Sequence, residues 1–379
     1  MATAGFGEGH NSAARNLVLA LGDRAEVLVA DPCAEGAPWL NSVLSSSYRS
    51  VTTHWPAVWA HCYRGVEKRD FSKKQFAFMR RAENALHATI ESFAPDIMVS
   101  TYPLYPYFMD RTRRALGRDI PIATMVTDSI EINAVWRNAP TDYWMVTDSH
   151  TRSSLIDHGL ERGRVVETGF PVHPGFANLP SLPPEDDLDP FRILYFPTAK
   201  KPTVRRIIRT LLDNSGGRGE VTIVLGRNVR KLYHKAREMK TAYPGRIRIK
   251  GWTKRVPELL CHHHLVVGKA GGATVHEALA AGTPMLIHHL VPGQEEGNLE
   301  LLRRYGGGSL ADSQEAQAAA LRDLLADGGS LWRVQKRNLM RQARRRASLV
   351  AAGFLLDLVP QETPKPAGGT AVVQSSPGA

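Results

Sequence analysis

Short apolar runs alternate with helical patterns along the whole chain. Apolar positions with the helical period fall at residues 12–21, 71–93 and 203–212. Strands are predicted at residues 26–30, 97–101, 122–127, 144–147, 165–167, 193–196, 221–225, 247–250, 265–267 and 285–288. This alternation predicts the α/β class, with parallel sheets covered by helices.

The alternation is interrupted once, at residues 178–190, where prolines and acids mix without a period, as in a linker. We therefore expect two doubly wound, Rossmann-like domains, 1–177 and 191–360, that face each other across a cleft. Ligands bind such domains at the carboxyl ends of the strands. The tail 361–379 is rich in Pro, Gly, Ser and Ala and is predicted to be disordered.

Composition excludes several classes of protein. The chain has 379 residues, 43% of them hydrophobic, which is enough for two cores. Its three cysteines, Cys33, Cys62 and Cys261, lack metal-ligand spacing, so we expect no metal site and a reducing compartment. No apolar run approaches the roughly 20 residues that cross a bilayer, so membrane contact is expected only from the surface.

The positive charge is concentrated in two blocks. The formal net charge is +11, with twelve Lys/Arg against two acids in residues 192–237 and seven against none in residues 328–356. Such blocks suit an anionic lipid surface or a phosphorylated substrate, and solvated helix faces are the alternative explanation. Nucleic acid is disfavoured because no DNA- or RNA-binding motif accompanies the charge.

Two glycine-rich loops each precede a helix. The first, Gly5 to Gly9, leads to His10, and Asp31 lies at about the spacing of a dinucleotide-binding acid. Only four residues precede this loop, so its strand is either very short or begins upstream. The second loop follows the strand at 265–267 and contains Gly271, Gly272 and Thr274, which form a diphosphate cradle at a helix N-terminus.

Taken together, these motifs resemble the diacylglycerol glycosyltransferases, that is, monogalactosyldiacylglycerol synthases and processive diacylglycerol glucosyltransferases. The resemblance covers residues 5–358 and implies the GT-B fold, a UDP-hexose donor, inversion at the anomeric carbon, and neither a cofactor nor a required metal. The motifs that carry it include Gly7-Glu8-Gly9-His10, Val126-Thr127-Asp128, Gly251-Trp252-Thr253, Gly271-Gly272-Ala273-Thr274 and Pro292-Gly293-Gln294-Glu295.

The resemblance also assigns roles to individual residues. It implies that His10 is the general base and that Asp128 orients or activates the acceptor, although a helix cap or a core contact accounts for either residue as well. The implied donor ligands are Glu277 for the ribose, Gly271, Gly272, Thr274 and Arg227 for the diphosphate, Val256 for the uracil, and Gln294 with Glu295 for the hexose. Lys200 and Lys201 stand where the family carries a glycine-rich turn, which leaves the contacts of that loop open.

A tryptophan-rich segment lies between residues 38 and 63. Trp39, Trp55 and Trp59 fall within it, and a basic run follows. Tryptophan favours the headgroup level of a bilayer, so this segment is predicted, with Gly7 and Gly9, to meet the acceptor and an anionic membrane surface. A helix pair packed on the core explains the same spacing.

The function expected is transfer of glucose or galactose from a UDP-sugar to diacylglycerol by a peripheral enzyme on the cytoplasmic face of a membrane. Three alternatives stay open: transfer from UDP-N-acetylglucosamine to a polyprenyl-diphosphate lipid, a UDP-sugar epimerase, and a noncatalytic lipid- or nucleic-acid-binding protein. The choice of hexose, the number of sugars added and the oligomeric state are not predicted.

Overall fold

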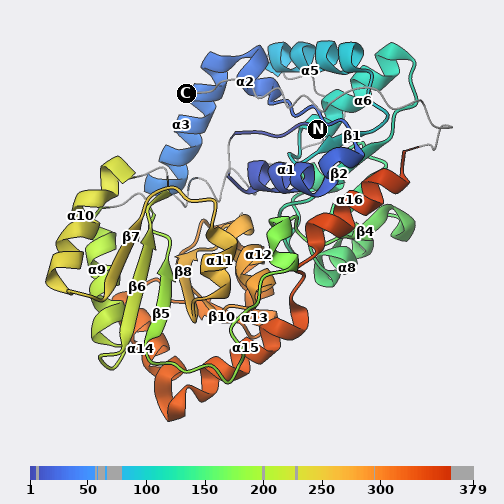
Figure 1. The fold of residues 1–379 in the computed structure, drawn as a ribbon. Helices are drawn as coiled ribbons and strands as arrows, with labels where there is room; N and C mark the ends of the chain where they lie inside the picture. Colours follow the sequence, from blue (N-terminus) through green and yellow to red (C-terminus); the bar gives the residue numbers. More distant parts are fainter. Residues whose placement is uncertain are drawn as a thin grey trace. The chain divides into compact units, whose positions relative to one another are not determined.

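The structure is a computed structural model that describes residues 1–5, 8–55, 58, 65, 79–198, 201–226, 229–293 and 295–359 (Figure 1). The chain divides into two compact units. Unit 1 comprises Met1–Pro174, Pro292–Gln294 and Arg346–Ala379, and unit 2 comprises Gly175–Val291 and Glu295–Arg345. Each unit is built on a parallel sheet with helices around it, which confirms the α/β class.

Unit 1 contains a four-stranded sheet in the order β1-β2-β3-β4. Its strands are β1 (Met98–Ser100), β2 (Ile122–Met125), β3 (Tyr143–Val146) and β4 (Val165–Glu167), all parallel. Its helices are α1 (Glu8–Leu21), α2 (Pro32–Gly36), α3 (Pro38–His54), α5 (Arg80–Phe93), α6 (Tyr105–Leu116), α7 (Ala134–Arg137), α8 (Ser149–Asp157) and α16 (Ala347–Asp357). Short 3-10 helices cover Gly22–Arg24 and Arg162–Arg164.

Unit 2 contains a six-stranded parallel sheet in the order β10-β9-β8-β5-β6-β7. Its strands are β5 (Phe191–Tyr195), β6 (Gly219–Val224), β7 (Ile247–Lys250), β8 (Leu265–Lys269), β9 (Met285–His289) and β10 (Gly308–Leu310). Its helices are α9 (Lys201–Asp213), α10 (Val229–Ala242), α11 (Val256–Cys261), α12 (Gly272–Ala281), α13 (Glu296–Arg304), α14 (Gln314–Leu325) and α15 (Ser330–Gln342). Short 3-10 helices cover Pro174–Ala177, where the chain passes from unit 1 into unit 2, and Ala326–Gly328.

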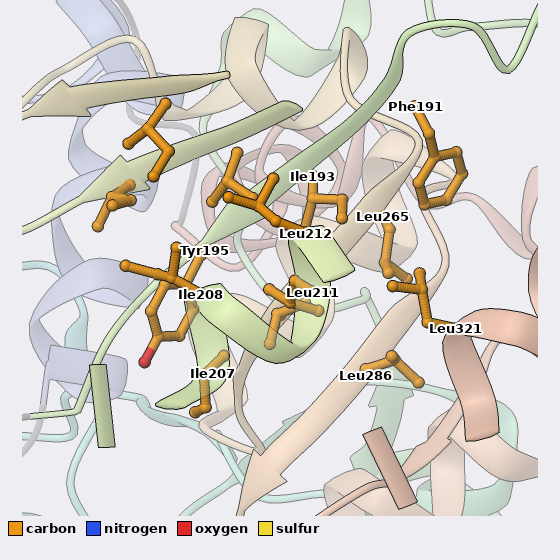
Figure 2. Packing of buried hydrophobic residues seen from close by; sticks show 14 of the residues in the cluster. Phe191, Ile193, Tyr195, Ile207, Ile208, Leu211, Leu212, Leu265, Leu286 and Leu321 are labelled. Atoms are coloured by element: carbon orange, nitrogen blue, oxygen red, sulfur yellow. The ribbon is translucent and has the colours of Figure 1, made fainter. Parts of the chain in front are cut away.

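The core of unit 2 forms where α9 packs on the sheet. Phe191, Ile193 and Tyr195 alternate along β5 and are fully buried. Figure 2 shows Ile193 and Tyr195 beside apolar side chains of α9 that belong to the same cluster, with Phe191 nearer to Leu265 of β8. Because helices cover both faces of the sheet, its central strands β5 and β8 are largely apolar, with Arg192 and Lys269 as the charged exceptions. This apolar pattern explains why the sequence located both strands.

Two elements differ from the sequence-based expectation. Residues 26–30, predicted as a strand, contribute only a bridge from Ala30 to Ala2, because the partner segment pairs over just a few residues. Conversely, β10 was not predicted, since its Gly308 and Ser309 carry no apolar pattern. It pairs with β9 at the edge of the sheet.

The segment 178–190, predicted as a linker, is tied to unit 2 by side chains at the amino ends of β5 and β8. His264 is fully buried; its Nδ1 accepts from the Arg192 backbone N–H (2.9 Å), and its Nε2 lies 2.8 Å from Asp186 Oδ2. Arg192 also donates to that carboxylate, at 2.8 Å. Burial lowers the pKa of His264 to about 4, so the ring is neutral and donates from Nε2.

The last described helix returns to unit 1. Ala352 of α16 packs with Ala20 and Leu21 of α1. The contacts therefore place α16 in unit 1, whereas the sequence-based division extended the second domain to residue 360.

Lys336 of α15 is a buried cation in unit 2. It is 1% exposed, and its Nζ lies 3.4 Å from the carbonyl oxygen of Ala281, at the C-terminal end of α12. Burial lowers its pKa to about 8 from an ordinary value of 10.5. The carbonyl groups at a helix C-terminus favour a cation, but they offset only part of this desolvation.

We predict that Lys336 makes the free energy of unfolding depend on pH. The unfolded state binds the proton more tightly, so the parent protein gains stability as pH rises from about 8 towards 10.5. Relative to Lys336→Met, this gain is roughly 2 kcal/mol between pH 7 and 10. Chemical denaturation of both proteins at the two pH values measures it. A stability difference that does not change with pH would show that the folded lysine titrates normally.

Candidate active site

The His10 side chain lies at the carboxyl edge of the sheet in unit 1. His10 is in the first turn of α1, and its Nδ1 is 3.0 Å from the hydroxyl of Thr127, two residues after the end of β2. Tyr102, just after β1, packs its ring edge-on against the imidazole with centroids 5.3 Å apart. The ring is thereby held by loops that follow two neighbouring strands.

Asp128, the second predicted catalytic residue, lies in the same group of side chains. Its Oδ2 accepts a hydrogen bond from the indole Nε1 of Trp136 at 2.8 Å. The Trp136 ring also lies against His10, with centroids 6.0 Å apart. One buried tryptophan therefore contacts both residues that the sequence proposed for acceptor chemistry.

The environment of His10 changes its acidity. Burial lowers its pKa to about 4, and a hydrogen bond with the backbone of Thr101 opposes the shift. The imidazole is therefore neutral at physiological pH and able to accept a proton. A lowered pKa also makes it a weaker base than a free imidazole.

Asp31 supports the glycine loop that precedes His10. Its Oδ2 accepts from the Gly5 backbone N–H at 2.9 Å, and its Oδ1 accepts from Ala34 at 3.1 Å, which caps α2. The spacing of Asp31 from the glycine loop suggested a dinucleotide-binding acid. In the structure its carboxylate instead accepts hydrogen bonds from backbone N–H groups. Gly9 lies in α1, and a Cβ there would meet nothing within 4 Å. Gly7 lies outside the described residues.

The predicted diphosphate loop lies at the carboxyl edge of the sheet in unit 2. The chain passes from the end of β8 through Gly271, in extended conformation, into α12 without a side-chain cap on the first backbone N–H groups. Gly272 and Thr274 lie in the first turn of this helix, and Glu277 follows in the next. An uncapped helix N-terminus carries a partial positive charge that attracts phosphate.

Other predicted donor ligands lie on neighbouring loops of the same unit or outside the described residues. Val256 is the first residue of α11, which follows β7. Because all strands of the sheet are parallel, the loops after β7, β8 and β9 emerge at one edge. Arg227 and Gln294 lie outside the described residues, as does Lys200.

Glu295 is oriented inward. It is 5% exposed, its Oε1 accepts from Lys269 Nζ at 2.6 Å, and its Oε2 accepts from the Val291 backbone N–H at 3.0 Å. Both carboxylate oxygens therefore have partners within the protein. Lys269, the last residue of β8, was not among the predicted ligands. The signal that could have identified it is a lysine two residues before Gly271.

A cavity of about 770 Å³ lies elsewhere in unit 1. Its walls include Val27, Leu28, Ile97 and Met98, and Met98 is the first residue of β1, at the amino end of that strand. His10 lies at the carboxyl ends of the strands. The cavity is therefore separate from the candidate site.

The tryptophan-rich segment presents apolar side chains to solvent. Trp39 on α3 is 74% exposed and Trp55, directly after α3, is 61% exposed, while Val43 and Val58 are about half exposed. In the part of the chain that the structure describes, these tryptophans are not core residues. Trp59 and the basic run that follows lie outside that part. None of the described helices is long and apolar enough to cross a membrane.

Comparisons with known proteins show what the sequence of this chain is similar to. Residues 10–172 match the model for monogalactosyldiacylglycerol (MGDG) synthase. A processive diacylglycerol beta-glucosyltransferase of Bacillus subtilis (strain 168) is 25% identical over 343 residues, which cover 88% of each chain. A probable chloroplastic monogalactosyldiacylglycerol synthase of Glycine max is 26% identical over 384 residues, covering 94% of this chain and 70% of that protein.

The fold is that of the GT-B glycosyltransferases. The structure of UGT71G1 from Medicago truncatula, complexed with UDP-glucose, matches with a TM-score of 0.59 at 14% identity, covering 94% of this chain and 97% of that one. Residues 10–172 are thus similar to the MGDG synthases, and most of the chain is distantly similar to the bacterial and plant diacylglycerol glycosyltransferases.

We predict that activity does not fall between pH 8 and pH 6. Since the pKa of His10 is about 4, its basic form persists throughout this range. An ordinary imidazole would lose about three quarters of its basic form by pH 6. The pH profile of kcat/KM reports this group in the free enzyme. A midpoint near 6.5 that disappears in His10→Ala would contradict the lowered pKa.

Proposed function

We propose that this protein transfers glucose or galactose from a UDP-sugar to the free hydroxyl of diacylglycerol at a membrane surface, with inversion at the anomeric carbon. The single observation that carries the proposal is the grouping of His10 with Thr127, Asp128 and Trp136 in unit 1. A neutral imidazole and a carboxylate thus contact the same tryptophan, within the segment that matches the MGDG synthase model.

The chemistry divides between the two units. In unit 1, His10 takes the proton of the acceptor hydroxyl as its oxygen forms a bond to the anomeric carbon. The bond from that carbon to the diphosphate oxygen breaks, and UDP leaves as an anion. In unit 2, the first-turn N–H groups of α12 stabilise the growing charge on the diphosphate, and Glu277 binds the ribose. This mechanism assigns no step to a cofactor or a metal ion.

The acceptor arrives from a membrane in this proposal. Trp39 and Trp55 are exposed on one segment of unit 1, and exposed tryptophan is favoured at the headgroup level of a bilayer. An anionic surface would also attract the positively charged chain. We therefore place the protein at a membrane surface, on the cytoplasmic side.

Product analysis tests the function directly. The purified protein is incubated with labelled UDP-glucose or UDP-galactose and diacylglycerol vesicles, and the lipids are separated. A labelled monohexosyl lipid is expected with one of the two sugars, and its loss in His10→Ala, with UDP affinity retained, supports the assigned base. Label found only on polyprenyl-diphosphate lipid would show that this lipid, and not diacylglycerol, is the acceptor. Epimerisation of the UDP-sugar without any acceptor would show that the protein is an epimerase and not a transferase.

We predict that Trp39→Ser with Trp55→Ser reduces sedimentation with anionic vesicles and slows transfer to bilayer diacylglycerol. Transfer to a soluble short-chain diacylglycerol should persist, because the exposed rings do not support the core. Their replacement should change stability by no more than about 0.5 kcal/mol. Vesicle sedimentation and the two transfer rates measure these effects.

The matched control is Trp252→Ser in unit 2, which removes a tryptophan that is 60% exposed but lies outside the segment around α3. It should leave vesicle sedimentation unchanged. Equal loss of transfer to both acceptors in the double variant would contradict the membrane assignment.

A further inference from the structure

Lys269 and Glu295 form an ion pair beside the predicted diphosphate loop. Lys269 ends β8 and Glu295 directly precedes α13, and their Nζ and Oε1 atoms are 2.6 Å apart. The two side chains differ in burial, since that of Lys269 is 49% exposed and that of Glu295 is 6% exposed. The ammonium thus reaches solvent while the carboxylate behind it does not.

The ammonium lies next to the residue that caps α12. A Cβ placed on Gly271 would be 3.1 Å from Lys269 Cε, 3.5 Å from its Nζ and 3.6 Å from Glu295 Oε1. The lysine side chain therefore passes over the entry to α12, where the first-turn N–H groups have no side-chain cap. Helix N-terminus and ammonium favour the same ligand, an anion.

The position of Glu295 is set by the backbone around it. Its Oε2 accepts from the Val291 N–H at 3.0 Å, and its own N–H donates to the Val291 carbonyl at 3.0 Å. One turn into α13, the buried Asn298 donates to the Ala270 carbonyl at 3.1 Å and ties that helix to the glycine loop. A carboxylate held in this way fixes the direction of a flexible lysine.

We propose that Lys269 binds the diphosphate of the nucleotide donor, and that Glu295 positions its ammonium instead of reading the hexose hydroxyls. This inference rests on the proposed function, because it assumes a nucleoside-diphosphate donor at α12. With the site empty, Glu295 compensates the lysine charge. With UDP bound, the ammonium supplements the helix N-terminus and stabilises the anion that leaves during transfer.

Nucleotide binding without any acceptor tests the role of Lys269. Calorimetry compares UDP with uridine for the parent protein, Lys269→Met and Lys269→Arg. Lys269→Met should lose UDP affinity about tenfold or more with uridine affinity unchanged, since a charge-assisted contact to phosphate is removed. Lys269→Arg should retain most of the affinity for UDP. The control Lys240→Met removes an exposed lysine from the last turn of α10 and should match the parent.

A double-mutant cycle tests the role of Glu295. If Glu295 positions Lys269, Glu295→Gln changes UDP affinity in the parent but has little further effect in Lys269→Met. If it reads the hexose instead, Glu295→Gln changes the ratio of UDP-hexose to UDP affinity equally in both backgrounds. That second pattern overturns the positioning role.

The possible failures are distinguishable. Parent-like UDP affinity in Lys269→Met, or an equal loss for uridine and UDP, overturns the role of Lys269 while the proposed transfer stands. A parent protein that binds no uridine nucleotide overturns the proposed function itself.

Discussion

The parallel direction of the strands is the constraint on which both candidate sites depend. In unit 1 it brings the loop after β1, which carries Tyr102, to the same edge as Thr127 and Asp128 after β2. In unit 2 it brings the loops after β7, β8 and β9 to one edge. Parallel pairing requires helical crossovers, and these bury both faces of the sheet, so polar groups collect where the strands end.

Each candidate site has a polar group in an environment that is energetically unfavourable for it. The His10 ring loses basicity by burial, and the loss secures an unprotonated nitrogen at neutral pH. The N–H groups at the start of α12 lack a side-chain cap, and the same lack leaves them available to an anion. In both cases the local structure is less stable than it could be, and the surrounding core supports it.

The sequence predicted the features that depend on apolar periodicity. It located the α/β class, the strands from β1 to β9 and the helices that follow the glycine loops, because burial on both faces gives most of these strands a clear apolar pattern. It did not predict β10, whose Gly308 and Ser309 are only partly buried at the sheet edge. Nor could it place α16 against α1, since that contact joins residues far apart in the chain.

For the candidate sites, the family resemblance indicated which positions carry functional residues. It did not indicate which side chains those residues contact. His10 and Asp128 were predicted separately, and only the structure shows that Trp136 contacts both. The ion pair of Lys269 with Glu295 and the hydrogen bond from the Gly5 N–H to Asp31 depend on the direction of the side chains. The spacing of residues in the sequence does not reveal that direction. The roles assigned to the individual donor ligands remain predictions.

The buried His264 has a consequence for how this sequence can vary. Its Nδ1 accepts from the backbone of β5, and its Nε2 donates to Asp186. An acidic residue at position 264 would bring a second carboxylate to Asp186, with Arg192 as the cation that both would share. Positions 186 and 264 should therefore change together among related sequences, even though 78 residues separate them.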